Sequence, residues 1–305
     1  MGAGCGGIGL RKAGREGLVL LALGAAAAFP AIAQEAQAPL VTSVDVGLSY
    51  DDNVRRSKDG ETHFTDSVLN VNLNRRLFYP IDENARWVVT WFAGADAFRE
   101  NTELSRVFGG IKAERQYRPS ADFDAPTLAL FGQVAGDYYG SLLRRGYRAA
   151  VGTSALLPIT DRIMTFGALT YSRRDAESAV FDSAETALRV NFDYAVTAST
   201  TLYLGAEYRV GDLVSSGPAS LANLDIAKWI VRDDAFTDGQ VFAYRFEGQA
   251  AIATVGWNIA MNARNALDFA FRMAVARPDE MPGYPGAVRA RYEVRQFFAT
   301  YLRTF

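Results

Sequence analysis

The feature of this sequence that most constrains its fold is a regular alternation of apolar and polar residues in many segments. In 188–196, for example, Leu188, Val190, Phe192 and Tyr194 alternate with arginine, asparagine and aspartate. Successive side chains of a β-strand point to opposite faces, so this pattern predicts strands with one apolar and one polar face. The segments with this pattern are 44–50, 69–73, 87–96, 104–117, 126–139, 145–157, 162–173, 188–196, 202–210, 242–249, 267–275 and 289–305.

The length of these segments separates two classes of β-protein. Most of them have about ten residues or more, whereas strands of soluble proteins most often have about five or six. A tilted strand that crosses a membrane needs about nine to eleven residues. The length therefore favours a membrane-spanning barrel over a soluble β-sandwich. After residue 33 no apolar stretch is long enough for a membrane-spanning helix.

The connections between the predicted strands differ in length on the two sides. Long loops are expected at 51–64, 173–182, 214–239 and 277–286, and short turns at 80–84, 158–161, 197–200 and 261–265. Two exceptions are the longer turn 118–126 on the short side and the tight link 100–103 on the long side. Short periplasmic turns and long extracellular loops are typical of outer-membrane barrels.

Closure of the sheet follows from the membrane environment. An open edge would leave backbone groups unpaired in lipid, so the last strand is expected to pair with the first. An even number of strands places both ends of the barrel domain on the periplasmic side. We therefore predict an all-β fold over 34–305, a closed antiparallel transmembrane β-barrel of about twelve strands.

Residues 1–33 have the organisation of a cleaved secretory signal peptide. Arg11, Lys12 and Arg15 precede the apolar run 17–30, and Ala31-Ile32-Ala33 follows it. These are the charged region, the apolar region and the small-residue cleavage site of such a signal. The run is too short and too rich in alanine to favour a membrane anchor. Export to the bacterial outer membrane is therefore expected.

The composition argues against several chemistries. The chain has 32 basic and 34 acidic residues, one histidine, His63, and one cysteine, Cys5, which lies in the signal. A histidine-based zinc site and a Cys-x-x-Cys site are excluded. A Ser-His-Asp triad would have to use His63, whose neighbours in the first long loop give no evidence of one. We predict no enzymatic activity, no cofactor, no metal site and no nucleic-acid partner.

The polar series of the predicted strands carries charges of both signs. Neither a soluble core nor lipid tolerates so many charges, so this series is expected to line the barrel interior. The candidate pore-lining residues are Arg106, Lys112, Arg148, Arg189, Asp193, Glu207, Arg209, Arg245, Glu247, Asp268 and Arg272. These residues either set the selectivity of a pore or pair across strands and partly plug it. Aromatic residues of this series either stack on sugar rings or fill the barrel, and they are Phe92, Phe108, Phe131 and Tyr203.

The chain ends in Gln-Phe-Phe-Ala-Thr-Tyr-Leu-Arg-Thr-Phe. Phe297, Tyr301 and Phe305 resemble the C-terminal signature by which bacterial outer-membrane β-barrel proteins are recognised by their assembly machinery. Arg303 departs from it, because the signature usually has an aromatic residue third from the end. Upstream of Gln296 the apolar residues fall on even positions instead of odd ones. This change of phase predicts either a β-bulge or a different register.

A second resemblance lies at the end of the first predicted strand. The sequence Gly-Leu-Ser-Tyr-Asp-Asp-Asn-Val, 47–54, resembles the opening of β-barrel porins, including those encoded with exopolysaccharide export systems. It is more weakly similar to the barrel of surface-lipoprotein assembly modifiers. Those proteins carry a helical-repeat domain before the barrel, and the few residues between Gln34 and the first strand leave no room for it. Taken alone, Asp51-Asp52-Asn53 indicates a polar turn.

Three functions follow from these patterns. The resemblance and the polar interior imply a narrow channel or porin-like pore, for saccharides or for polysaccharide export. An adhesin, structural or export-accessory barrel would act through its extracellular loops, of which 214–239 is the best candidate. Alternatively this loop folds back and constricts the pore, or it is an ordinary surface loop, and its segment 222–231 is compatible with a short helix. An outer-membrane enzyme is the least favoured. The expected partners are outer-membrane lipid and lipopolysaccharide, the β-barrel assembly machinery and a saccharide ligand.

Overall fold

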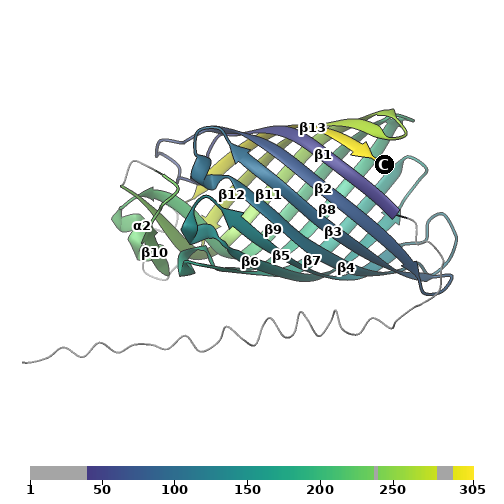
Figure 1. Ribbon diagram of the computed structural model, residues 1–305, viewed down its shortest axis with the longest axis horizontal. Coiled ribbons are helices and arrows are strands. Elements are labelled where there is room, and N and C mark those ends of the chain that lie inside the picture. The colour runs from purple at the N-terminus through teal and green to yellow at the C-terminus, as the bar shows by residue number, and fades with distance from the viewer. Residues whose placement is uncertain (1–39, 237–239, 280–290) are drawn as a thin grey trace, which may run out of the picture. The chain divides into compact units, whose positions relative to one another are not determined.

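A computed structural model describes residues 40–236, 240–279 and 291–305, which are almost entirely β-strand (Figure 1). The strands are β1 (Leu40–Asp51), β2 (Asp66–Pro80), β3 (Ala85–Phe98), β4 (Arg106–Tyr117), β5 (Thr127–Tyr139), β6 (Gly146–Pro158), β7 (Ile163–Ala176), β8 (Ser183–Thr197), β9 (Thr200–Pro218), β10 (Trp229–Arg232), β11 (Val241–Asn262), β12 (Asn265–Pro278) and β13 (Tyr292–Thr304). The predicted signal peptide, 1–33, and most of the predicted loop 277–286 lie outside the described residues.

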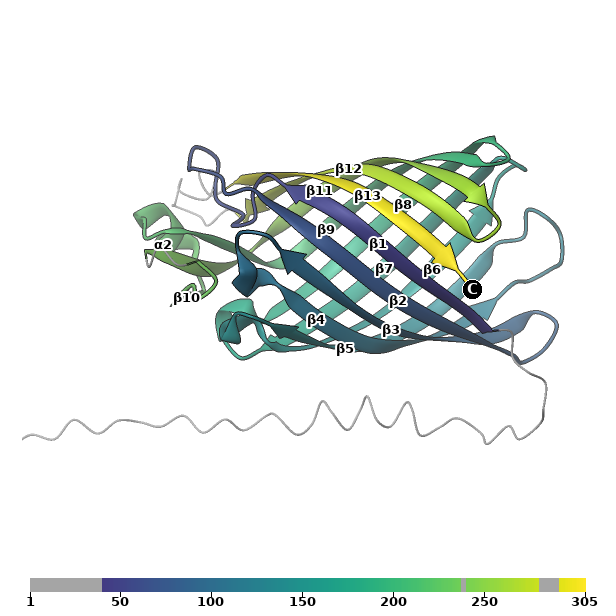
Figure 2. The same cartoon turned by 45° about the horizontal axis from the view of Figure 1, so that its top comes forward.

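The strands form a closed ring. Each strand pairs antiparallel with its neighbour in the chain from β1 to β9 and from β11 to β13. β13 pairs with β1, from Ser43 opposite Thr304 to Asp51 opposite Gln296, and β9 pairs with β11. The ring therefore contains twelve strands, and β10 lies outside it on the edge of β11. This confirms the prediction of a closed antiparallel barrel (Figure 2).

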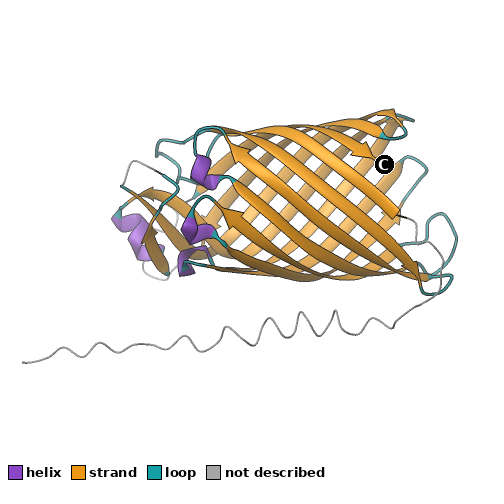
Figure 3. Cartoon of the chain, in the orientation of Figure 1, coloured by secondary structure: helices purple, strands orange, loops and turns teal. Residues whose placement is uncertain are grey.

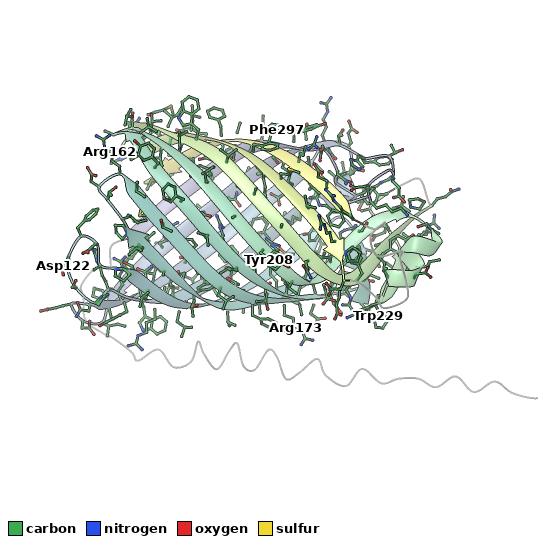
Figure 4. All side chains as sticks on the ribbon, turned by 180° about the vertical axis from the view of Figure 1, so that it is seen from behind. Asp122, Arg162, Arg173, Tyr208, Trp229 and Phe297 are labelled. Atoms are coloured by element: carbon green, nitrogen blue, oxygen red, sulfur yellow. The ribbon has the colours of Figure 1, made fainter. Side chains whose placement is uncertain are left out.

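The two ends of the barrel differ as the loop lengths predict. All short helices lie at one end, namely η1 (Thr102–Leu104), η2 (Leu142–Arg144), η3 (Ala179–Phe181) and α2 (Leu221–Ile226), as Figure 3 shows. The opposite end carries the turns near Asp122 and Arg162, and the C-terminus also lies there (Figures 3 and 4). In outer-membrane barrels the short turns face the periplasm and the long loops face outward.

The apolar series lies on the outside of the barrel. Leu48, Leu130 and Leu204 are 64%, 62% and 59% exposed, and Phe297 likewise projects away from the wall (Figure 4). A soluble monomer rarely exposes so continuous an apolar surface, whereas a membrane-spanning barrel needs an apolar band toward lipid. Within the described residues, no helix combines the length and the hydropathy needed to cross a membrane.

β9 and β11 extend beyond the ring as a two-stranded ribbon. Their pairing continues from Gly211 opposite Gly248 to Pro218 opposite Val241, where β8 and β12 no longer accompany them. Gly211 has a φ of 143°, a conformation that favours glycine. A Cβ at either glycine would collide with a carbonyl oxygen of the neighbouring wall strand. The ribbon therefore leaves the wall at a pair of glycines.

The ribbon corrects two predictions about the segment 214–249. The predicted strand 242–249 lies mainly in the ribbon, and the part of β11 inside the ring is the stretch that follows it. Its apolar residues Tyr244 and Phe246 do not face lipid, because both are buried under the ribbon and its neighbours. The expected helix over 222–231 is confirmed only for its first half, α2, since Trp229–Arg232 forms β10.

β13 contains no bulge. Its pairing with β12 is continuous from Tyr292 opposite Ala276 to Arg303 opposite Asn265. Tyr292 and Val294 are buried in a cluster with Leu213 and Phe246. β13 is therefore a regular strand. Before Gln296 its apolar residues Tyr292 and Val294 point inward at the rim, and from Phe297 onward its odd-numbered apolar residues point outward.

Candidate functional site

Nine of the eleven predicted pore-lining residues lie on the inner face of the barrel wall, since they alternate with exposed apolar side chains. These nine are Arg106, Lys112, Arg148, Arg189, Asp193, Glu207, Arg209, Asp268 and Arg272. Arg245 and Glu247 lie elsewhere. Both are on the outer face of the ribbon, where Arg245 lies 5.8 Å from the ring centre of Trp229 and Glu247 pairs with Lys228. Their placement in the pore is wrong because β11 has already left the ring at this point.

Most interior cations are paired with carboxylates. Arg106 contacts Asp96 at 2.6 Å and Asp137 at 3.6 Å, and Arg148 contacts Asp137 at 3.5 Å. Within β4, Lys112 contacts Glu114 at 2.6 Å, and Arg209 of β9 contacts Glu207 on its own strand and Glu185 on β8. The pairs that join two strands stabilise the sheet. This part of the charged interior therefore serves the wall itself.

The four interior aromatic residues named from the sequence lie against the barrel wall. Each lies over a glycine on the neighbouring strand, directly opposite in the register. A Cβ added at Gly94 would lie 2.5 Å from Phe108 Cζ, and one at Gly110 would lie 2.6 Å from Phe92 Cζ. The four pairs are Phe92 with Gly110, Phe108 with Gly94, Phe131 with Gly152, and Tyr203 with Gly256. The rings lie along the wall because the glycines have no side chain there.

Cations cover the free faces of two of these rings. The Arg106 guanidinium lies 4.7 Å from the ring centre of Phe108, and Lys112 Nζ lies 4.5 Å from that of Phe131. Both distances allow a cation–π interaction. The aromatic surface that a sugar ring could stack on is therefore partly occupied by the protein.

A cavity of about 320 Å³ opens in the interior wall across β8, β9, β11, β12 and β13. Three arginines line it, Arg189, Arg209 and Arg272, together with Glu207. It lies along a row of paired residues in which Asn191 faces Gly205, Gly205 faces Thr254, and Thr254 faces Arg272. The cavity exists because the two middle positions of this row carry small side chains.

The loop after β10 is attached to the opposite wall of the long-loop end. Arg144, in η2, donates hydrogen bonds of 2.6 and 2.7 Å to the two carboxylate oxygens of Asp233. Ser216 Oγ donates a further bond of 2.6 Å to Asp233, and Ser141 donates to Asp234. The Asp233 side chain is completely shielded from solvent. Buried charges persist only when they are paired and hydrogen-bonded in this way.

Phe236 anchors the same segment in an apolar cluster. It is 4% exposed and packs with Leu104, Ala235 and Val241. Leu104 lies between β3 and β4, and β4 is six strands from β11 in the ring of twelve. Residues 233–236 therefore reach from one side of the mouth to the opposite side. We refer to the ribbon of β9 and β11, with β10 and residues 233–236, as the lid.

Electrostatics at the lid favour its attached state at neutral pH. Burial by itself would raise the pKa of Asp233. The hydrogen bonds and charge of Arg144, with donors from Ser216 and the amide of Ala235, hold that pKa below its ordinary value instead. Asp233 is therefore ionised and bound to Arg144 at neutral pH.

The Asp-Asp-Asn sequence after β1 organises the first loop. Asn53 is fully buried, and its amide donates to the carbonyl oxygens of Ser57 and Glu293. Asp51 accepts two hydrogen bonds of 2.8 Å from Arg56, and Asp52 accepts one of 2.7 Å from the Arg295 amide. The motif therefore ties the loop to the rim and to β13.

His63 has none of the features of a catalytic base. Its side chain is exposed in the β1–β2 loop, and no hydrogen bond joins it to another described residue. Across 40–236, 240–279 and 291–305, no three His, Cys, Asp or Glu side chains gather in a way that could hold a metal ion.

The sequence matches no family model and no curated protein. Among solved structures, the chain is similar to an outer membrane channel from Pseudomonas putida F1, with a TM-score of 0.55 and 10% sequence identity, over 89% of this chain and 99% of that one. The fold is that of a bacterial outer-membrane β-barrel. Similarity also extends to the KdgM porin, with a TM-score of 0.45 and 10% identity over 86% and 99% of the two chains. The NanC porin has a TM-score of 0.46 and 9% identity over 85% and 98%. Export of exopolysaccharide stays a prediction.

Sequence reasoning did not identify the aromatic–glycine pairs or the lid contacts. The residues of each pair are visible in the sequence, but their opposition depends on a register that periodicity alone does not give. The bond between Arg144 and Asp233 joins residues 89 positions apart, and no local pattern signals it.

Proposed function

We propose that this protein is a narrow, porin-like channel for small hydrophilic solutes across the outer membrane. The observation that carries the proposal is the placement of four interior aromatic rings over glycines of the neighbouring strands, which keeps these four rings close to the wall of a largely polar lumen. A barrel that served only as an anchor would gain stability by filling its interior with such side chains. The likeness in fold to an outer membrane channel supports the same function.

Saccharides are the proposed solutes. Asn70, Asn72 and Asn74 form a row on the inner face of β2, and Asn191 and Asn258 lie on the far side of the ring. An amide side chain both donates and accepts hydrogen bonds, as a sugar hydroxyl does. Single sugars and short oligosaccharides suit the interior better than a polymer, because the lid crosses the mouth and the interior cavity has only about 320 Å³.

The test is ion conductance of the refolded protein in a planar lipid bilayer. Discrete small steps are expected, and the steps should decrease when a permeating sugar is added. The heat-modifiable gel shift of a folded barrel verifies insertion-competent protein. Asp233→Asn serves as a second sample, because it weakens the lid. If both folded samples stay silent, the channel proposal is rejected.

We also propose the partners that the barrel needs for assembly. Phe297 and Tyr301 lie on the outer face of β13, Phe305 follows its last residue, and all three are exposed to recognition by the assembly machinery as the barrel closes. Outer-membrane lipid and lipopolysaccharide would then cover the apolar band. Replacing Phe305 by Ser should reduce the amount of folded barrel in the outer membrane, measured in cells by the heat-modifiable gel shift.

A second candidate function is binding through the lid. Its support is a group of exposed apolar side chains on α2 and β10, namely Leu224, Trp229 and Ile230. Figure 4 shows Trp229 at this end of the barrel. This second function is favoured only if the folded barrel shows no ion conductance in planar bilayers. Pull-down with the folded protein and with a Trp229→Ser, Ile230→Ser variant would then test it, since a specific partner should be lost from the variant.

A further inference from the structure

We propose that the interior cavity binds a small organic acid through its carboxylate, with Arg272 as the main anchor. The proposal deepens the channel function by naming a solute class, and it rests on that function for its biological meaning. The chemistry of the site, however, can be measured without any conduction.

The pairing of the three arginines singles out Arg272. Arg209 is bound by Glu207 and Glu185, and Arg189 donates to the side-chain oxygen of Asn191 at 3.1 Å. Arg272 makes no hydrogen bond or ion pair with any other described residue. Its guanidinium nevertheless lines the cavity and is partly buried. A guanidinium carries five donors in a planar fork, and a carboxylate fits that fork with two parallel hydrogen bonds.

The charge of the lining selects an anion with a single negative charge. Three guanidinium groups and one carboxylate, that of Glu207, line the cavity. Glu207 and Glu185 both contact Arg209 and offset two of the three positive charges, so a net charge of about +1 remains to attract an anion. A monocarboxylate therefore fits better than phosphate or a dicarboxylate.

The remaining lining accommodates a carbon skeleton. Ile252 and Phe298 face the cavity beside Thr254 and Asn191. Apolar contacts favour the carbon chain of an organic acid, and the two polar side chains offer hydrogen bonds to its hydroxyl groups. The volume, about 320 Å³, is at the lower end of the range of small-molecule sites. A hydroxylated acid of sugar size satisfies all these features.

Equilibrium binding to the refolded, detergent-solubilised protein tests the proposal. The probes are gluconate, glucose as a neutral molecule of similar size, and inorganic phosphate, each titrated by calorimetry. Gluconate should bind, and Arg272→Gln should weaken it about tenfold or more, as expected for loss of a charge-assisted pair. Arg272→Lys should fall between the two, because a lysine keeps the charge but loses the fork.

Arg76→Gln is the matched control. Arg76 is also an interior arginine without a hydrogen bond or ion pair to another described residue, but it lies on β2, three strands from β12 in the ring, and does not line the cavity. Its replacement should leave gluconate affinity unchanged. The gel shift verifies that each variant is folded.

Three results would overturn the proposal. They are no gluconate binding by the unmodified protein, equal affinity of Arg272→Gln and the unmodified protein, and phosphate binding as tight as gluconate binding. If the protein shows conductance steps but does not bind gluconate, the proposed binding site is rejected and the channel function is retained. If gluconate binding depends on Arg272 but the protein never conducts ions, the channel function is rejected and the binding site is retained.

Discussion

Arg144 and Asp233 join the barrel wall to the lid. Arg144 follows β5, and its two parallel hydrogen bonds of 2.6 and 2.7 Å reach a carboxylate that belongs to the far side of the ring. Neither group has a substitute partner of equal quality nearby. The pair therefore controls how firmly the long-loop end is closed.

Replacing Asp233 by Asn should loosen the lid. The change removes the carboxylate that holds Arg144 through two hydrogen bonds and leaves it only one ion pair, with Asp234, 3.6 Å away. The cost is therefore expected to lie below the value of about 3–5 kcal/mol that is typical of breaking a fully buried pair. We expect larger or longer conductance steps, and faster proteolysis within 219–240, with the barrel itself intact. Lys228→Ala is the control, because its ion pair with Glu247 is exposed and contributes little. If the two variants behave identically, the Arg144–Asp233 pair does not hold the lid in place.

Acid should release the lid in the unmodified protein. The pKa of Asp233 is lower in the folded state than in an unfolded loop. Its contribution is therefore complete above the ordinary aspartate pKa of about 4 and disappears as the pH falls through the lower, folded value. Conductance should be constant from about pH 7 to pH 5 and should rise below about pH 4. Asp233→Asn should already be open at neutral pH and should lose this rise.

Gly94→Ala should narrow the lumen. The new Cβ would lie 2.5 Å from Phe108 Cζ and 2.7 Å from the Val71 carbonyl oxygen. The ring has to leave the wall and turn into the lumen, and overpacking of this kind costs about 1–3 kcal/mol. Single-channel conductance and the thermal midpoint should both fall. Gly132→Ala provides the comparison, since nothing lies within 4 Å of its added Cβ.

Phe236→Ala should destabilise the lid without unfolding the barrel. Removal of a buried phenylalanine costs about 3–5 kcal/mol in a well-packed core. Here the loss should appear as faster amide hydrogen exchange in 229–236 and near Leu104, because these segments share the cluster. The exposed Phe123, in a turn at the other end, is the control residue. Unchanged exchange at Leu104 would show that Phe236 does not bridge the mouth.

The fold was largely predictable because a membrane imposes strict rules on a β-sheet. Alternation sorts lipid-facing from interior residues, and lipid excludes open edges, so Leu188 to Tyr194 and its equivalents already define a closed barrel. The rule fails where the chain leaves the membrane. At Arg245 and Glu247 the alternation continues, but the apolar face no longer points to lipid, because Tyr244 and Phe246 are buried within the protein. Periodicity does not mark that boundary.

The candidate site was predictable in composition but not in geometry. Arg189, Arg209 and Arg272 were identified as interior residues from alternation alone. Glu207 and Asn191 each lie two residues from their partner on the same strand, but the contact between Glu185 and Arg209 depends on the register of β8 and β9. Periodicity alone therefore did not show which arginine lacks a partner. The hollow at Gly205 and Thr254 has the same origin, because small residues matter only when they are known to be adjacent.

The ribbon determines how the mouth can open. Its two strands are hydrogen-bonded to each other without interruption from the wall to Pro218 and Val241. The lid is therefore a stiff ribbon that is attached to the wall at one end, and no flexible linker joins the two. Release of Asp233 loosens the tip of this ribbon, although Phe236 and the hydrogen bonds of Ser215 and Ser216 to Arg56 and Arg55 still hold it. The attachment of the ribbon at Gly211 and Gly248 stays in place. The end of a stiff ribbon moves when the ribbon bends, and its displacement increases with the applied force. We therefore expect the released channel to show graded conductance that varies with voltage or solute load, in place of two fixed levels.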